Sequence, residues 1–158
     1  MNLKMAELKH CLEKAGFAKV KTLLSSGNVA FDSKMRSVAA IEKRIETALE
    51  KEFGRTFHTV VRSTEELSEL IERDPYREYR LPADAKRVVT FARRLNKPRQ
   101  PLPIVREGAQ ILSVTEREAF SAYMPGPRGP VFMELIKATF GADQTTRTWD
   151  TVKKCAKG

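Results

Sequence analysis

The chain has 158 residues, of which 41% are hydrophobic, and it carries a net charge of +9. This length suffices for one compact domain or for two small lobes that share a core. No run of eighteen apolar residues occurs, and the first residues lack the apolar core of a signal peptide. These features exclude a membrane-spanning helix, and we expect a cytoplasmic protein.

The two cysteines, Cys11 and Cys155, have no second Cys or His at the spacing of metal ligands. The sequence therefore predicts no metal site and no cofactor. A disulfide between the two cysteines is not expected in a reducing compartment.

Positive charge is concentrated in the second half of the sequence. Residues 1–79 contain fourteen Lys/Arg and thirteen Asp/Glu, whereas residues 80–158 contain fifteen and seven, a net charge of +8. A basic segment of this kind attracts anionic partners such as nucleic acid. Charged faces are also often merely solvated, and that alternative stays open.

The first half of the chain shows the pattern helix–strand–strand–helix–strand–helix. Apolar spacing predicts a helix over 3–15 that ends at Gly16, and antiparallel strands over 19–24 and 29–32. Ser37 is the expected N-cap of a second helix that ends at Gly54. A third strand is predicted over 57–61, and the spacing of Ser63 and Glu66 predicts a capping box before a short helix.

The turn between the first two predicted strands contains Ser26, Gly27 and Asn28, which are residues typical of chain reversals. A nucleophilic Ser25 or Ser26 would require a base and a group that orients it. Neither His10 nor His58, the only histidines, has acidic residues at a suitable spacing. We therefore interpret the turn as structural. No catalytic constellation can be recognised, so the sequence leaves open whether the protein is an enzyme.

The second half is predicted to contain mainly strands and loops. The expected elements are a strand over 87–92, a loop over 96–103, a hairpin of strands 109–114 and 119–123, a Pro/Gly loop over 125–130, a helix over 132–140, and a last helix from Thr148 or Trp149. Recurring hairpins predict an α+β fold with mostly antiparallel sheets. We expect two lobes, residues 1–78 and a basic lobe of residues 79–158.

The strongest candidate site precedes the last predicted helix. Thr145, Thr146 and Arg147 offer hydroxyl groups and a cation at a helix N-terminus, where free N–H groups favour an anion. Trp149 offers a flat surface for a base. The alternative is structural, with a threonine cap and a buried tryptophan in the core.

A second candidate is the strand over 87–92. Under strict alternation Phe91 shares a face with Arg87 and Arg93, as in a stacking platform for RNA, although the glycine and aromatic pattern of such domains is missing. Arg128 in the Pro/Gly loop is a candidate contact for phosphate or carboxylate, with an exposed loop tip as the alternative. The basic residues that flank this strand are Lys86, Arg87, Arg93, Arg94, Lys97 and Arg99.

Several short motifs resemble one bacterial family. They are Met5-x-x-Leu8, Ala15-Gly16-Phe17, Ser26-Gly27-Asn28-Val29, Val60-Val61-Arg62-Ser63, and the tail 145–152, Thr-Thr-Arg-Thr-Trp-Asp-Thr-Val. In this order they resemble the uncharacterised family known as domain of unknown function 1697. The resemblance implies an α+β fold with ferredoxin-like lobes and brings no established activity, cofactor or catalytic residue.

Two departures from the family pattern bear on structure. Thr148 and Asp150 stand where the family has asparagine, and the sequence begins just after the family's apolar first strand and its Arg-Gly-Ile-Asn loop. A first lobe without that strand has an unpaired sheet edge, at which a second copy could pair to form a homodimer.

Three functions follow from these patterns. The sequence favours a binding module for nucleic acid or another phosphate-bearing anion, which would use the basic second half. The first alternative is an enzyme or sensor for a small anionic metabolite that uses Arg147 and its neighbouring hydroxyls. The second alternative is a structural or dimerising module.

Overall fold

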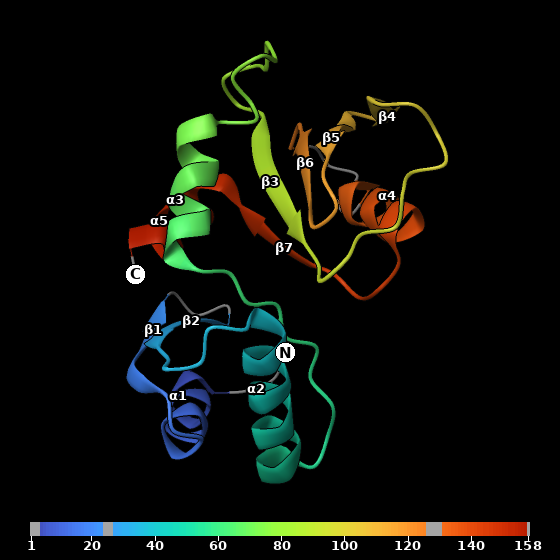
Figure 1. Ribbon diagram of the computed structural model, residues 1–158. Coiled ribbons are helices and arrows are strands. Elements are labelled where there is room, and N and C mark those ends of the chain that lie inside the picture. The colour runs from blue at the N-terminus through green and yellow to red at the C-terminus, as the bar shows by residue number, and fades with distance from the viewer. Residues whose placement is uncertain (1–3, 24–26, 126–130, 158) are drawn as a thin grey trace. The chain divides into compact units, whose positions relative to one another are not determined.

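The backbone divides into two compact units. The computed structural model describes residues 4–23, 27–125 and 131–157 (Figure 1). Unit 1 consists of residues 1–68 together with 154–158, and unit 2 of residues 69–153. Among the described residues, no helix combines the length and the apolar character that crossing a membrane requires.

The two units carry similar net charges, unlike the two halves of the sequence. Unit 1 contains fourteen Lys/Arg and nine Asp/Glu, and unit 2 contains fifteen and eleven. The net charges are therefore +5 and +4. Because this division falls at residue 68 and returns the C-terminal lysines to unit 1, overall charge no longer singles out one part of the chain as the binding part.

Unit 1 packs two helices against a hairpin. Helix α1 (Met5–Lys14) is followed by strands β1 (Ala18–Leu23) and β2 (Asn28–Asp32), which pair antiparallel, and by helix α2 (Val38–Phe53). Apolar side chains from all four elements form its core, among them Leu12, Val20 and Ile45. Alternation in the strands and the i, i+4 spacing in the helices place these side chains on the side of each element that faces the core.

The predicted caps of these helices are confirmed. The Ser37 hydroxyl accepts a hydrogen bond of 3.3 Å from the backbone N–H of Ala40, and Gly54 ends α2 with φ of 71°. Helix α3 (Thr64–Arg73) begins after Ser63, whose hydroxyl accepts from the backbone N–H of Glu66 at 3.1 Å. Local sequence alone determines such caps, because the capping side chain and the capped N–H are three residues apart.

The predicted strand over 57–61 is wrong, since this segment pairs with no strand of the described chain. Carboxylates of α2 take the place of a partner strand. The backbone N–H of Thr59 donates to Glu46 Oε2 at 3.1 Å, and that of Val61 donates to Glu42 Oε2 at 2.9 Å. Two carboxylates one helical turn apart thus match alternate N–H groups of an extended segment.

Unit 2 contains a five-stranded antiparallel sheet. Its strands are β3 (Lys86–Phe91), β4 (Ile104–Arg106), β5 (Ala109–Val114), β6 (Glu118–Tyr123) and β7 (Thr145–Thr148), in the order β4-β5-β6-β3-β7. The expected α+β fold with antiparallel sheets is confirmed. The structure adds β4 and β7, which the sequence patterns did not predict.

Both faces of this sheet are covered. Helix α4 (Val131–Phe140) packs Leu135 and Ile136 against Val88 and Ile111 on one face (Figure 1). On the other face Tyr76 meets Phe120, with ring centroids 6.1 Å apart, and the first residue of helix α5 (Trp149–Lys157). The strands of a doubly covered sheet are buried along most of their length, as β3 and β6 are.

Two buried hydroxyl groups in this sheet have no hydrogen-bond partner among the described residues: those of Thr90 and Ser121, both 0% exposed. An unpaired buried hydroxyl costs about 1–3 kcal/mol. We therefore expect Thr90→Val, which replaces the hydroxyl by a methyl group of the same shape, to raise the free energy of unfolding by about 1 kcal/mol. Urea denaturation measures the change.

Thr139→Val is the matched control for this substitution. The Thr139 hydroxyl donates to the backbone oxygen of Leu135 at 2.7 Å, so its loss should lower stability. A Thr90→Val variant that unfolds as easily as the Thr139 variant would show that the Thr90 hydroxyl makes a stabilising bond.

Candidate anion-binding surface

The threonines before α5 lie in a strand and not in a capping loop. Strand β7 pairs antiparallel with β3, with Thr145 opposite Phe91 and Thr146 opposite Thr90. Only Thr148 caps the helix, because its hydroxyl accepts from the backbone N–H of Thr151 at 3.3 Å. The predicted cluster of three hydroxyl groups at the helix N-terminus is therefore not formed.

The Arg147 side chain folds back along its own strand. Its Nη1 atom donates to the backbone oxygen of Thr146 at 2.7 Å and to Thr145 Oγ1 at 3.2 Å. These bonds hold the guanidinium close to β7. The N–H groups that make these bonds are not available to a bound metabolite.

Trp149 is a core residue, as the structural alternative predicted. Its side chain is 7% exposed, and its ring centroid lies 5.3 Å from that of Tyr76. The Tyr76 hydroxyl donates to the backbone oxygen of Val88 at 2.7 Å, and burial raises the pKa of this hydroxyl above its ordinary value. The buried indole offers no surface on which a base could stack.

The predicted stacking platform on β3 is also wrong. Alternation does place Arg87 and Phe91 toward one face, but Arg93 lies beyond the end of β3 and Phe91 is only 7% exposed. Arg87 lies at the other end of the strand, where its guanidinium is 6.0 Å from the centre of the Tyr76 ring. Face assignment from alternation was correct, whereas exposure depends on what covers the face.

Two predicted residues, Ser26 and Arg128, lie outside the described residues. The rest of the predicted turn behaves as a structural feature. Gly27 has φ of 83°, a conformation that favours glycine, and Asn28 begins β2 opposite Leu23.

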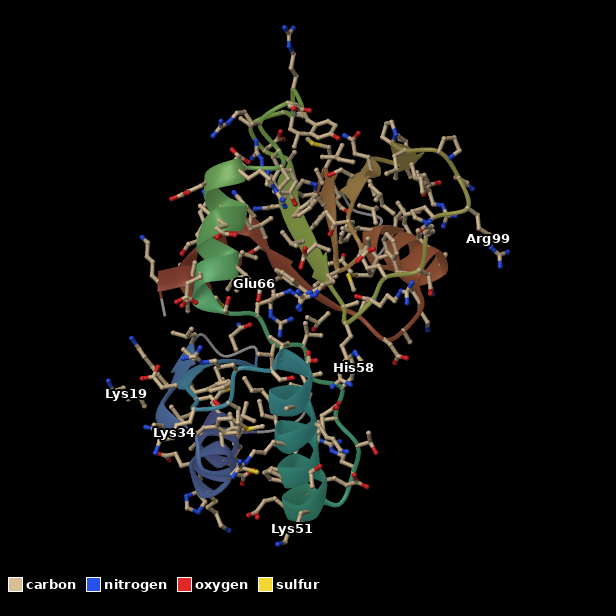
Figure 2. All side chains as sticks on the ribbon, in the orientation of Figure 1. Lys19, Lys34, Lys51, His58, Glu66 and Arg99 are labelled. Carbon is tan, nitrogen blue, oxygen red and sulfur yellow. The ribbon has the colours of Figure 1, made fainter. Side chains whose placement is uncertain are left out.

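Part of the basic set that flanks β3 stands out once the fold is known. Residues 85–106 contain seven Lys/Arg and no Asp/Glu, and the stretch 93–99 leads out of β3. We call residues 93–99 the cationic loop. Arg94, Lys97 and Arg99 are exposed, and Figure 2 shows the Arg99 side chain directed away from the ribbon.

The backbone of the cationic loop is fixed to the rest of unit 2. The N–H of Ala92, just before it, donates to Arg117 O at 3.0 Å, and that of Leu95 donates to Glu116 O at 2.8 Å. Asn96 Nδ2 reaches the last residue of α4, donating to Phe140 O at 3.4 Å. Leu95 itself is 8% exposed and packs into the core beside α4. The buried leucine and the hydrogen bonds of Leu95 and Asn96 hold the first part of the loop, next to the bonded Ala92, while Arg94, Lys97 and Arg99 are exposed.

Arg94, Lys97 and Arg99 form no ion pair with any residue that the structure describes. The ion pairs identified in the described chain, Lys14–Glu52 at 3.5 Å and Lys19–Asp32 at 3.7 Å, are both in unit 1. Glu116 is the exposed acid on the hairpin that holds the loop. Arg94, Lys97 and Arg99 are thus available to an anion from solution.

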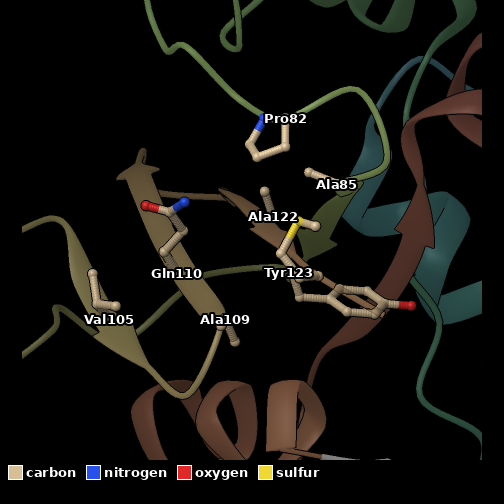
Figure 3. A pocket seen from close by; sticks show the side chains of 9 residues that line it. Pro82, Ala85, Val105, Ala109, Gln110, Ala122 and Tyr123 are labelled. Carbon is tan, nitrogen blue, oxygen red and sulfur yellow. The ribbon is translucent and has the colours of Figure 1, made fainter. Parts of the chain in front are cut away.

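A pocket of about 160 Å³ lies elsewhere in unit 2, where β4, β5 and β6 meet the segment before β3 (Figure 3). Small and apolar side chains line most of it, including Pro82, Ala85 and Ala122, and Gln110 contributes an amide. Pockets for drug-sized ligands are usually about 300–1,000 Å³, so this one fits no more than a side chain or a small fragment. No group of His, Cys, Asp and Glu suited to a metal occurs among the described residues.

The fold and surface define a small α+β protein with an exposed basic loop after β3. The family model for proteins of unknown function, DUF1697, matches residues 1–120, and the chain belongs to that family. The resemblance noted in the sequence is thereby confirmed. No curated protein matches the chain at a significant level.

A solved structure has a similar fold. It is the conserved bacterial protein SP0830 from Streptococcus pneumoniae, with a TM-score of 0.72 and 19% sequence identity. The alignment covers 99% of this chain and 88% of that one. At this identity the likeness concerns the fold alone.

Proposed function

We propose that the protein binds the phosphate backbone of nucleic acid through the cationic loop. The observation that supports this is the exposure of Arg94, Lys97 and Arg99, which pair with no described residue, on a loop held by the Leu95 N–H and the Asn96 side chain. Cations on a fixed loop lose less conformational freedom on binding than cations on a mobile tail. They also attract a polyanion over a distance of about 8–10 Å at moderate salt.

Binding to the phosphate backbone of nucleic acid fits the residues of the cationic loop better than recognition of a single small anion. A small anion needs several donors that converge on one point, usually within a pocket. The exposed cations of the loop come from positions two to five residues apart along the chain, and the pocket that we describe lies in another part of unit 2. The metabolite alternative depends on Arg147, whose guanidinium already donates to two groups of its own strand.

Self-association is the second candidate function. In the described chain the hairpin of unit 1 has two strands, so the sheet ends at β2. An isolated pair of strands is marginally stable, and an open edge can accept a strand of a second copy. Light scattering that finds a monomer at high protein concentration would contradict this candidate.

Neutralising the loop should abolish most of the binding. For Arg94→Gln/Lys97→Gln/Arg99→Gln we expect weaker binding to a labelled nucleic acid of any sequence and a flatter salt dependence. Each lost phosphate contact should reduce the slope of log K against log salt by about 1. Fluorescence anisotropy at several salt concentrations measures both effects.

The control variant removes the same charge from unit 1. Lys9, Lys43 and Lys51 are exposed and form no ion pair with a described residue, so Lys9→Gln/Lys43→Gln/Lys51→Gln lowers the net charge equally. The proposal requires the control to bind almost as the unaltered protein does. Equal losses in both variants would mean that overall charge and not the loop carries the binding.

A further inference from the structure

We infer that the cationic loop prefers a duplex to a single strand and contacts it through phosphates without reading bases. This inference rests on the proposed function and concerns the class of nucleic acid. It comes from the burial of the aromatic side chains together with the position of the exposed cations.

No exposed aromatic side chain offers a stacking surface. The chain has eight Phe, three Tyr and one Trp, and all twelve lie in the described ranges. None of them is exposed; each is buried or half-buried. The large apolar side chains that are exposed among the described residues are aliphatic or Met: Leu102, Val105, Met124 and Met133.

Proteins that prefer single strands gain much of their affinity from bases stacked on aromatic rings, about 1–3 kcal/mol for each base. Without such rings, the phosphates supply the affinity for either form. A duplex has the higher charge density and releases more counterions, with a salt slope of about −0.9 for each phosphate contact against about −0.7 for a single strand. The same cations therefore bind a duplex more tightly.

The position of the loop is compatible with a broad, stiff ligand. Its cations project from a fixed backbone at the end of β3, beside the end of α4, where Asn96 meets Phe140. The exposed Lys137 in the last turn of α4 adds a further cation in unit 2 near this end. A fixed array of charges suits a rigid duplex, whereas a flexible strand would have to lose conformational freedom to follow it.

The test compares a labelled DNA duplex with one of its own strands, using the full chain and fluorescence anisotropy at low and at physiological salt. We expect the duplex to bind roughly fivefold more tightly at low salt, given the two slopes and about three contacts. Duplexes of unrelated sequence should bind alike. Trp149 fluorescence should stay unchanged on binding, because the indole is buried.

The possible results separate this inference from the proposed function. Equal or tighter binding of the single strand would overturn the duplex preference, and quenching of Trp149 would contradict binding through phosphates alone. Either result would leave the loop proposal in place. Binding of neither form at low salt would overturn both. A duplex preference that persists undiminished in the loop variant Arg94→Gln/Lys97→Gln/Arg99→Gln would place the duplex site elsewhere and also overturn the inference.

Discussion

Replacing Trp149 by alanine is expected to lower the free energy of unfolding by about 3–5 kcal/mol, as is typical for a buried aromatic side chain. The indole is 7% exposed and packs on Tyr76, which in turn contacts Phe120 of the sheet. Its removal leaves a cavity between α5 and one face of the sheet. Urea denaturation followed by far-ultraviolet circular dichroism measures the loss.

Lys153 provides the control for this substitution. Its ammonium lies 5.9 Å from the centre of the same indole, but the side chain is exposed. Lys153→Ala should change stability by about 1 kcal/mol or less, since exposed cation–π contacts contribute about that much. A Trp149→Ala variant no less stable than the Lys153 variant would contradict the core role of the indole.

Replacing Glu42 by alanine is expected to lower the free energy of unfolding by about 2–3 kcal/mol, because a hydrogen bond to a charged group contributes about 1.5–3 kcal/mol to stability. Glu42 is 5% exposed, and its carboxylate accepts the N–H of Val61 at 2.9 Å. The substitution frees the segment over 57–61 from α2 at one of its two anchors. We also expect faster hydrogen exchange at the Val61 amide.

Two further substitutions separate the hydrogen bond from general effects of charge. Glu42→Gln keeps an oxygen that can accept from the N–H of Val61, so this variant should lose less stability than Glu42→Ala. Glu50→Ala removes an exposed carboxylate from the same helix and should change stability by about 0.5 kcal/mol or less. A loss that is equal for Glu42→Ala and Glu50→Ala would contradict the anchoring role.

Local features of this fold could be predicted from the sequence. The Ser37 cap, the Gly54 helix end, the Ser63 capping box and the hairpin that closes near Gly27 each depend on residues a few positions apart. Patterns of this range are visible in a single sequence.

The errors concern contacts between distant segments. The stretch over 57–61, Phe-His-Thr-Val-Val, is rich in residues that favour strands, but the N–H groups of Thr59 and Val61 are bonded to carboxylates of α2 that lie 13 and 19 residues earlier. Strand β7 is a polar run, Thr-Thr-Arg-Thr, whose pairing with β3 no local pattern indicates. Tertiary partners decided both cases.

The candidate site changed for a similar reason. The sequence suggested Phe91 and Trp149 as stacking surfaces, because alternation and composition indicate which side chains share a face. They do not indicate which other segments cover that face. The sequence already showed the cations of the loop beside the strand over 87–92, and the absence of acid over residues 85–106, with Leu95 as the apolar anchor, sets them apart. Its rigidity came only from bonds to Glu116, Arg117 and Phe140.

The most direct test of the loop as a binding surface is an amide chemical-shift titration of the labelled protein with a DNA duplex. We expect the largest shifts at the amides of residues 93–97 and 99 and at residues 116–117, whose carbonyl groups accept from Leu95 and Ala92. We expect small shifts in β7 and in unit 1. Shifts that are largest at Thr145–Thr148, or spread evenly over the exposed lysines of unit 1, would contradict the proposal.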